Sequence, residues 1–226
     1  MMADNFAYSR ALFDWCTGNG IPFVYASSAA VYGGAAAFSE DAANERPLNV
    51  YAWSKLVFDQ FVRKRLASVD SLVAGLRYFN VYGPREQHKG RMASVAWHLW
   101  QQHRADGRVR LFNGSHGVGP GEQRRDFVHV DDAVAVTLWL GAQGAAASGV
   151  YNCGSGRAEP FNAVAGAILD FYGHGTLDYV EFPPALLPAY QAYTCADLTR
   201  LRAAGCAQPM RDVASGVREY LRWLDS

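Results

Sequence analysis

The sequence lacks the features that indicate a membrane-spanning, secreted or nucleic-acid-binding protein. It has no apolar run long enough to cross a bilayer. Its first residues, MMADNFAYSR, contain neither the basic region nor the apolar region of a signal peptide. Its 21 basic and 21 acidic residues give a formal net charge of +0, so no overall field attracts a nucleic acid or an anionic membrane surface. We therefore expect a cytoplasmic protein that binds neither a membrane nor nucleic acid.

Cysteine is also scarce in this chain. Cys16, Cys153, Cys195 and Cys206 form no C-x-x-C pair, and their spacing is not that of metal ligands. We interpret them as reduced residues in a cytosolic core rather than as disulfide partners, and we expect no metal site. The 226 residues, of which 50% are hydrophobic and 19% charged, suffice for one sizeable core or two small ones.

Apolar strands alternate with helices along the chain, which predicts an α/β fold with a parallel sheet. Residues 21–26 and 72–79 are apolar without alternation, as strands buried inside a parallel sheet are. A helical period covers residues 50–66 between them. The other expected elements are helices at 5–17, 92–103, 131–140, after Pro160 and at 213–224, strands at 109–112, 126–130 and 149–153, and loops at 80–90 and 114–123.

The segment from Tyr51 to Lys55, YAWSK, is the clearest candidate for chemistry. Residues four apart on a helix lie on one face, with Cβ atoms about 5–6 Å apart. A phenol with a pKa of about 10 is a poor base at neutral pH, and a neighbouring ammonium favours the phenolate. The pattern Y-x-x-x-K also occurs by chance, with the ring packed on the lysine stem, so the surrounding elements decide its meaning.

Two strand ends supply that context. The expected strand at 21–26 stops at Ser27-Ser28, and the strand at 72–79 ends in Arg77-Tyr78-Phe79-Asn80. Ligands of parallel sheets bind at the carboxyl ends of the strands. A serine at such an end, followed by a tyrosine and a lysine one helical turn apart, resembles the site of the short-chain dehydrogenase/reductase superfamily.

The resemblance narrows to the ADP-L-glycero-D-manno-heptose 6-epimerase family and extends over essentially the whole chain. Its most specific parts are HKG at residues 88–90 and YQAYT at residues 190–194. The stretches that carry it are YASSAAVYGG, PLNVYAWSK, RYFNVYGPRE, HKG, MASVA, RRDFVHV, GSGRAE and YQAYT.

The resemblance implies a reaction and the residues that perform it. Enzymes of this family oxidise C6″ of the heptose to an aldehyde with NADP⁺ and return the hydride to the other face. Tyr51 then serves as one acid/base and Lys89 as the second. Lys55 supports the charge of Tyr51 and holds the cofactor ribose, while Ser28 hydrogen-bonds the reacting hydroxyl. As a base, Lys89 needs a lowered pKa, which burial in a closed site can provide.

Cofactor and substrate contacts also carry over by resemblance. The cofactor contacts are Lys55, Val81 and Asn5. The guanidinium fork of Arg125 suits the pyrophosphate of the substrate. The full set of implied substrate contacts is Asn80, Arg91, His98, Phe112, Asn113, Gly114, Ser115, Arg125 and Tyr190. The family is cytoplasmic and homo-oligomeric, with pentamers where it is characterised, and it makes an ADP-heptose precursor of the lipopolysaccharide inner core.

The resemblance also divides the chain into two parts. Residues 1–80 and 126–149 match half of a Rossmann domain, and residues 81–125 and 150–226 match mainly a smaller substrate-binding lobe with a terminal helix. The first strands and the glycine-rich turn of the Rossmann domain are missing from the sequence. We therefore expect the chain alone to bind NADP weakly and to be inactive.

Glycine-rich residues at 154–156 are not a substitute for that turn. They follow an expected strand, but position 159 is Glu rather than Gly, and no acidic residue follows at the required distance. A sugar-nucleotide dehydratase is disfavoured because Ala29-Ala30 stand where it needs an acidic pair. Two alternatives remain: a related NDP-sugar 4-epimerase, for example acting on UDP-galactose, and a non-catalytic remnant without cofactor binding.

Overall fold

The computed structural model describes residues 1–115, 117–184 and 190–226, and the chain forms two compact units. The first unit contains Met1–Phe79, Ala133–Cys153 and Ala196–Gln208. The second unit contains Asn80–Asp132, Gly154–Cys195 and Pro209–Ser226. The α/β fold with a parallel sheet is confirmed. The expected division into a cofactor half and a substrate lobe has somewhat different boundaries, and it stays a proposal about function.

A three-stranded parallel sheet forms the centre of the first unit, in the order β1 (Phe23–Ser28), β2 (Val73–Tyr78) and β6 (Gly149–Cys153). Ser28 lies opposite Tyr78, and Tyr78 lies opposite Cys153, so the three carboxyl ends meet at one edge. Gly75 in the central strand is required by packing, because a Cβ atom there would lie 2.4 Å from the Tyr25 ring of β1.

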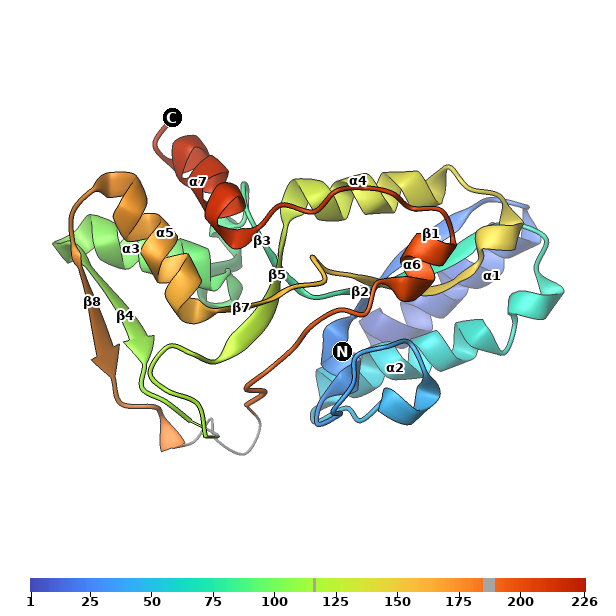
Figure 1. The fold of residues 1–226 in the computed structure, drawn as a ribbon. Coiled ribbons are helices and arrows are strands. Elements are labelled where there is room, and N and C mark those ends of the chain that lie inside the picture. The colour runs from blue at the N-terminus through green and yellow to red at the C-terminus, as the bar shows by residue number, and fades with distance from the viewer. Residues whose placement is uncertain (116, 185–189) are drawn as a thin grey trace. The chain divides into compact units, whose positions relative to one another are not determined.

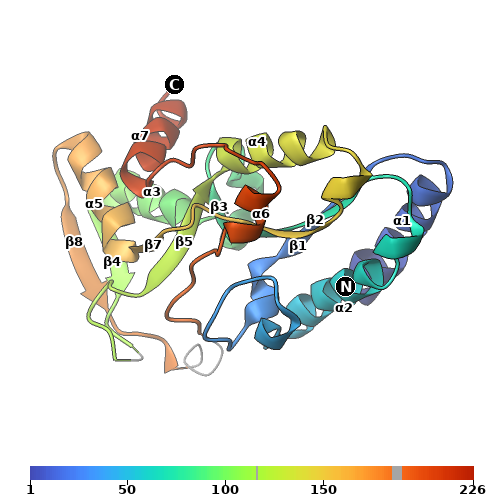
Figure 2. The same ribbon diagram turned by 45° about the vertical axis from the view of Figure 1, so that its right-hand side comes forward.

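Helices cover both faces of this sheet (Figures 1 and 2). On one side lie a π-helix (Ala3–Tyr8), α1 (Ser9–Gly18) and α2 (Val50–Arg63), and on the other lies α4 (Val130–Gly141). Asn49 starts α2, because its side chain accepts a hydrogen bond from the backbone N–H of Ala52. The residues that pack α1 and α2 on the sheet are Phe13, Tyr25, Phe58, Val62 and Val73.

The described residues of the second unit form short strands and helices. β3 (Asn80–Tyr82) pairs in parallel with β5 (Arg124–His129), which pairs antiparallel with β7 (Ala158–Pro160). β4 (Arg108–Phe112) pairs in parallel with β8 (Thr176–Val180). The helices are α3 (Val95–Asp106), α5 (Phe161–Tyr172) and α7 (Val213–Leu224).

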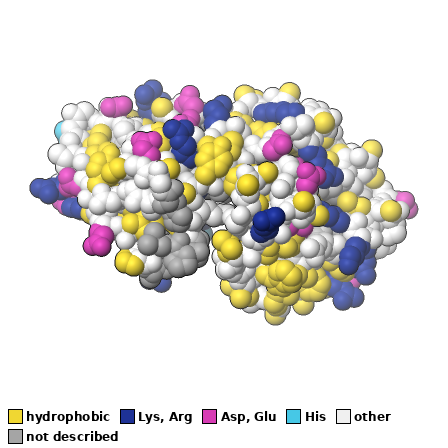
Figure 3. Space-filling view, turned by 60° about the horizontal axis from the view of Figure 1, so that its bottom comes forward, with side chains coloured by type: hydrophobic (Ala, Val, Ile, Leu, Met, Phe, Trp, Pro, Cys, Tyr) yellow, Lys and Arg dark blue, Asp and Glu magenta, His cyan; other side chains and the backbone are white. Residues whose placement is uncertain are grey.

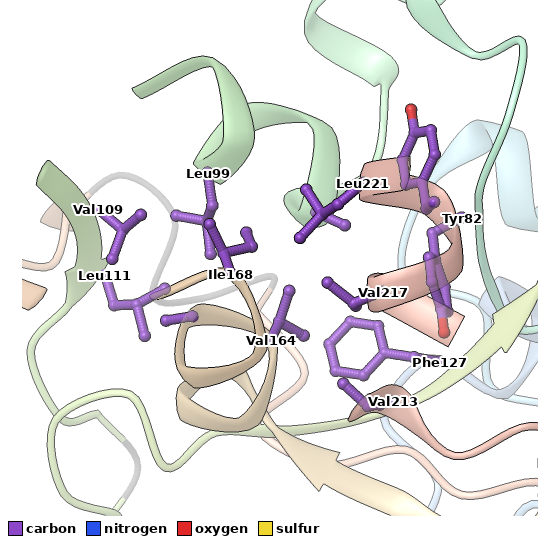
Figure 4. Close-up of a cluster of buried hydrophobic side chains, with 13 residues drawn as sticks. Tyr82, Leu99, Val109, Leu111, Phe127, Val164, Ile168, Val213, Val217 and Leu221 are labelled. Atoms are coloured by element: carbon purple, nitrogen blue, oxygen red, sulfur yellow. The ribbon is translucent and has the colours of Figure 1, made fainter. Parts of the chain in front are cut away.

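Apolar side chains from these helices and strands form one core (Figure 4). Leu99 of α3, Ile168 of α5 and Leu221 of α7 are each at most 1% exposed. α7 approaches β3 closely at Gly216, where a Cβ atom would lie 2.0 Å from the Tyr82 hydroxyl. The second unit therefore has a hydrophobic core of its own.

The remaining elements are short. They are the 3-10 turns Ala29–Tyr32, Ala42–Asn44, Leu66–Ser68, Gln87–Met92 and Ala145–Ala147, and α6 (Thr199–Ala203). Within the described ranges, no helix is long and apolar enough to span a membrane.

Most expected elements are present, with shifted boundaries. The helix expected over 50–66 ends at Arg63, and the strand expected over 21–26 runs from Phe23 to Ser28. The expectation of a continuous loop at 80–90 was wrong, because Asn80–Tyr82 forms β3. That strand depends on its partner β5, which lies far away in the sequence and gives no local signal.

Candidate active site

Ser28, Tyr51 and Lys55 all belong to the first unit, at the carboxyl end of β1 and the start of α2. Tyr51 and Lys55 are one turn apart on α2, as the spacing predicts. The Lys55 Nζ donates a hydrogen bond of 2.9 Å to the backbone carbonyl of Ala26, two residues before Ser28. The lysine is thereby tied to the strand end where parallel sheets bind their ligands.

The Tyr51 ring is accessible, with 41% of its surface exposed. Figure 3 shows hydrophobic side chains gathered over the helical side of the first unit. Exposed residues of α1 and α2 include Leu12, Trp15, Val50, Tyr51 and Trp53. A ligand can therefore reach Tyr51 in the part of the chain that the structure describes.

The environment of Lys55 acts on its charge in two directions. Burial lowers the pKa of the half-buried Lys55 ammonium, and the Asp59 carboxylate acts against that decrease. Lysine has three N–H donors, and one of them is engaged by Ala26. The other two are available for hydroxyl groups of a ligand.

Ser28 also has a definite local role. Its Oγ accepts a hydrogen bond of 3.2 Å from the backbone N–H of Ala30 and so caps the 3-10 turn after β1. Because Oγ is the acceptor there, its own proton remains available for donation. Asn5, a predicted cofactor contact, donates to Ser54 Oγ at 3.0 Å, and Ser54 Oγ donates to the backbone carbonyl of Tyr51.

A pocket in the second unit contains three of the predicted substrate contacts. His98, Phe112 and Tyr190 line a cavity of about 320 Å³. The other lining residues were not predicted, and they are Val95, Leu99, Gln102, Arg110, Leu111, Gly121, Gln123 and Phe161. Gln102 could have been found, because it follows His98 by four positions on α3 and so shares its face.

Arg125 lies next to two of the aromatic residues of this pocket. Its guanidinium carbon is 4.8 Å from the centroid of Tyr190 and 5.7 Å from that of Phe161. Its Nη1 donates to the carbonyl of Arg124 at 2.9 Å. Burial lowers the pKa of Arg125 and raises that of Tyr190. The predicted pyrophosphate contact is thus a buried cation held by aromatic rings.

The run from Phe112 to Ser115 forms a closed turn beside the same pocket. Gln123 Nε2 donates to the carbonyl of Asn113 at 3.0 Å and to Ser115 Oγ at 3.1 Å. Gly114 has no room for a side chain, because a Cβ atom there would lie 2.2 Å from the carbonyl oxygen of Val118. Asn113, Gly114 and Ser115 therefore form one hydrogen-bonded segment, whereas Phe112, the last residue of β4, lines the cavity with its side chain.

Lys89 lies on an exposed loop, and its assignment as the second base stays a prediction. It lies in the 3-10 turn Gln87–Met92 of the second unit and is exposed, as is Arg91. The role of a base requires a closed site around this lysine, and within the described second unit its side chain is exposed. Its backbone N–H donates to the carbonyl of Glu86 at 2.9 Å.

Glu86 organises the loop that carries Lys89. This carboxylate is 3% exposed and accepts hydrogen bonds from the backbone N–H and the hydroxyl of Ser94, at 2.7 and 2.6 Å. Because Ser94 starts α3, the loop is anchored at the beginning of that helix. Of the two remaining predicted contacts, Asn80 is exposed and Val81 is half-buried, both in β3.

The turn Gly154-Ser155-Gly156 is occupied by a carboxylate of the chain itself. Asp126 accepts hydrogen bonds from the backbone N–H groups of Ser155 and Gly156, at 2.6 and 2.9 Å. It also accepts one from the Ser155 hydroxyl at 2.8 Å. A phosphate group bound at this turn would need the same donors. Because Asp126 already uses them, the geometry agrees with the conclusion that residues 154–156 are not a dinucleotide-binding turn.

A parallel α/β sheet with a serine at a strand end, followed by a tyrosine and a lysine on the next helix, defines a protein of the short-chain dehydrogenase/reductase class. Comparison with known families agrees with this class. The model of the NAD dependent epimerase/dehydratase family matches residues 1–154. The chain therefore belongs to this family, whose members use a nicotinamide cofactor.

Within this family, the chain is similar to two ADP-L-glycero-D-manno-heptose-6-epimerases. The chain is 58% identical over 221 residues to an ADP-L-glycero-D-manno-heptose-6-epimerase of Alkalilimnicola ehrlichii, covering 98% of the chain and 69% of the relative. It superimposes on the crystal structure of the Helicobacter pylori ADP-L-glycero-D-manno-heptose-6-epimerase with a TM-score of 0.84 and 32% identity. That match covers 98% of this chain but 66% of the Helicobacter pylori chain, slightly under two thirds of its length.

A more distant structure shares the fold. The Thermus thermophilus UDP-glucose 4-epimerase in complex with NAD matches with a TM-score of 0.79 and 24% identity, over 98% of this chain and 70% of that one. By family, the chain is therefore an epimerase-type enzyme.

Proposed function

We propose that this chain supplies catalytic and substrate-binding residues of an enzyme that interconverts ADP-D-glycero-D-manno-heptose and ADP-L-glycero-D-manno-heptose. The sequence identity of 58% to an enzyme of that name supports the choice of substrate. The observation that carries the reaction type is the hydrogen bond from Lys55 to Ala26, which ties the Tyr51–Lys55 pair to the strand end beside Ser28. The product belongs to the synthesis of lipopolysaccharide inner-core precursors.

The donors around Lys55 fit the nicotinamide end of the cofactor. Two N–H groups of Lys55 remain after its bond to Ala26, and ribose hydroxyls are suitable acceptors for them. Asn5 and Val81 are the other residues that we assign to this end, and NADP is the form that we propose. When bound, the cofactor accepts a hydride from C6″ and returns it to the opposite face.

The phosphate end of the cofactor has no corresponding residues in this sequence. The turn at residues 154–156, which follows a strand and invites the assignment, is filled by Asp126. We therefore propose that the chain by itself binds NADP weakly and is inactive, and that activity requires a glycine-rich N-terminal segment of the kind that Rossmann domains have.

The proton transfers are assigned to the side chains of this chain. Ser28 donates a hydrogen bond to the reacting oxygen, since its Oγ already accepts one from Ala30. Tyr51 removes the hydroxyl proton from one epimer, and the ammonium of Lys55 stabilises the phenolate. Lys89 performs the same transfer for the other epimer, because inversion at one carbon requires an acid/base on each side.

The cavity in the second unit is proposed as the nucleotide subsite. Its aromatic residues Phe112 and Tyr190 offer flat faces to an adenine ring. Gln102, whose Oε1 accepts a hydrogen bond from the backbone N–H of Arg110, offers its NH₂ group to the polar edge. Arg125, which contacts Tyr190, is assigned to the pyrophosphate. His98, Asn80, Arg91 and the 112–115 turn complete the substrate contacts. We further propose that the enzyme is a cytoplasmic homo-oligomer, with a pentamer as the family assembly.

A substrate assay tests the proposal. The chain is joined to the N-terminal segment of the Alkalilimnicola ehrlichii relative and incubated with NADP⁺ and each ADP-heptose epimer, and the products are separated by chromatography. We expect either epimer to give the same mixture. Conversion of UDP-galactose instead would identify an NDP-sugar 4-epimerase, and conversion of neither substrate would favour a non-catalytic remnant.

A further inference from the structure

A third residue follows Tyr51 and Lys55 on the same face of α2. Asp59 comes one turn after Lys55, so the three side chains lie at positions i, i+4 and i+8. Asp59 is 0% exposed, which is unusual for a carboxylate unless it is paired. The reaction assigned to this site does not use it.

The carboxylate of Asp59 is surrounded by donors. Oδ1 accepts a hydrogen bond from the Tyr25 hydroxyl at 3.0 Å. Oδ2 accepts one from the Ser27 hydroxyl and one from Arg77 Nε, both at 2.9 Å. An ionised carboxylate only accepts hydrogen bonds, so this environment suits the charged form of Asp59.

The donors of Asp59 and the acceptor of Lys55 are adjacent on β1. Tyr25 and Ser27 flank Ala26, whose carbonyl accepts the hydrogen bond from Lys55. Two successive turns of α2 therefore bind three consecutive residues of one strand. A shift of the helix along the strand would break all of these hydrogen bonds together.

Arg77 supplies the positive charge that pairs with the Asp59 carboxylate. It lies in the central strand β2 at 0% exposure, and it pairs with both Asp59 and Glu45. Glu45 pairs in turn with Arg63 at 2.5 Å. Two carboxylates and two guanidinium groups thus compensate one another: burial raises the pKa of Asp59, and its contacts with Arg77, Ser27 and Tyr25 act against that rise.

We propose that Asp59 is a positioning residue for the Tyr51–Lys55 pair, which sets the register of α2 on β1 and keeps Lys55 in its ammonium form at the Ala26 carbonyl. The proposal rests on the proposed function for the use of Lys55 in catalysis, but its geometry is independent of the substrate. The balance of charges supports it, because burial lowers the pKa of Lys55 and Asp59 opposes that decrease.

The lysine content of the chain permits a direct test. Lysine occurs only at positions 55, 64 and 89. The chain is labelled with lysine carrying ¹³C at Cε, the three resonances are assigned with Lys64→Arg and Lys89→Arg, and each is titrated with pH. In Asp59→Asn we expect the pKa of Lys55 to fall by about one unit or more, while those of Lys64 and Lys89 stay unchanged.

Glu45→Gln is the matched control. It removes a buried carboxylate of the same cluster, which binds Arg77 and Arg63 and, unlike Asp59, forms no hydrogen bond with β1 residues 25–27 in the described structure. We expect it to leave the pKa of Lys55 unchanged. An unchanged pKa in Asp59→Asn, or an equal shift in both variants, would overturn the proposal.

A second variant covers the case in which Asp59→Asn does not fold. Replacing both partners of the ion pair, with Asp59→Asn and Arg77→Gln, leaves no unpaired charge between them, and such double replacements are often tolerated. The pKa of Lys55 in this double variant should lie below that in Arg77→Gln, a comparison that isolates the loss of the Asp59 charge, and equal values would overturn the proposal. Because no substrate is present, this result is separate from the epimerase assay. With the completed enzyme, Asp59→Asn should also shift the basic limb of the pH–rate profile to lower pH.

Discussion

The guanidinium group of Arg125 lies over the ring of Tyr190, with its carbon 4.8 Å from the ring centroid. Arg125 is 8% exposed, and Tyr190 lines the cavity of the second unit. An arginine that stacks on an aromatic ring keeps its in-plane N–H groups directed outward, where a pyrophosphate can accept them. The two residues come from YQAYT and RRDFVHV, so this contact joins two of the stretches that carry the resemblance.

The first prediction concerns Arg125. Arg125→Lys keeps the positive charge but loses the stacked, forked geometry, so the affinity of the chain for ADP should fall about tenfold. Arg124→Lys is the matched control, because Arg124 is the neighbouring exposed arginine and should have little effect. Calorimetric titration with ADP measures both. Equal affinities for the two variants would show that Arg125 does not bind the pyrophosphate.

The second prediction concerns the two proposed bases. In the chain completed with a relative's N-terminal segment, Tyr51→Phe and Lys89→Met should each reduce epimerisation by at least about 100-fold, since each removes one acid/base. Binding of ADP should be retained, because neither substitution alters Arg125. Lys64→Met is the control, an exposed lysine at the end of α2. If Lys89→Met keeps nearly the parent rate, Lys89 is an ordinary loop lysine and the assignment of two bases is wrong.

Gly75 provides a third prediction, on stability. A Cβ atom at this position would lie 2.4 Å from the Tyr25 ring, so Gly75→Ala displaces this ring from its contacts with Phe58 and Asp59. We expect a loss of about 1–3 kcal/mol in the free energy of unfolding, measured by urea denaturation. Gly18→Ala is the control, because no atom lies within 4 Å of the added methyl group and alanine favours the helix α1. Similar stability of the two variants would contradict the close packing at Gly75.

The fourth prediction is that the buried His129 makes the free energy of unfolding depend on pH. It is 2% exposed, and its Nδ1 accepts a hydrogen bond of 3.3 Å from the backbone N–H of Asp131, which requires the neutral ring. Burial lowers the pKa of His129, with Asp131 and Asp132 acting against it and Arg211 with it. The unfolded chain therefore binds a proton at His129 more readily than the folded chain does. The contribution of the neutral His129 to the free energy of unfolding is complete above a pH of about 6.5 and is lost as the pH falls below that value.

Urea denaturation between pH 5 and pH 8, a range of about three units around the ordinary histidine pKa, measures this dependence. The free energy of unfolding of His129→Gln should fall less from pH 8 to pH 5 than that of the parent chain. His88→Gln, which replaces an exposed histidine, should behave like the parent chain. The same acid dependence in His129→Gln and the parent would contradict the prediction.

Much of the local structure could be predicted because side-chain order encodes it. The final helix was expected over 213–224 and is α7 with those bounds, since its apolar residues recur on one face and Asp212 caps its start. Tyr51 and Lys55 could be paired for the same reason, because a spacing of four on a helix brings two side chains to one face. The strand-end serine followed from the uniformly apolar run before it.

Other features depend on residues that are far apart in the sequence. Asp59 meets Tyr25 and Arg77, which are 34 and 18 positions away, and no local pattern indicates that these side chains are buried together. β3 exists because it pairs with β5, and the Asp126 carboxylate reaches Ser155 across 29 positions. The exposure of Lys89 likewise depends on how Glu86 anchors its loop to α3.

By itself, the sequence determined the α/β class, the Tyr51–Lys55 pair and the family resemblance, because helical period, apolar runs and short motifs are properties of neighbouring residues. Only the tertiary structure decided which charges are buried, which amides line the cavity and which donors surround Asp59. Those outcomes follow from desolvation and packing, which depend on the distances between atoms in the folded chain rather than on their order along it.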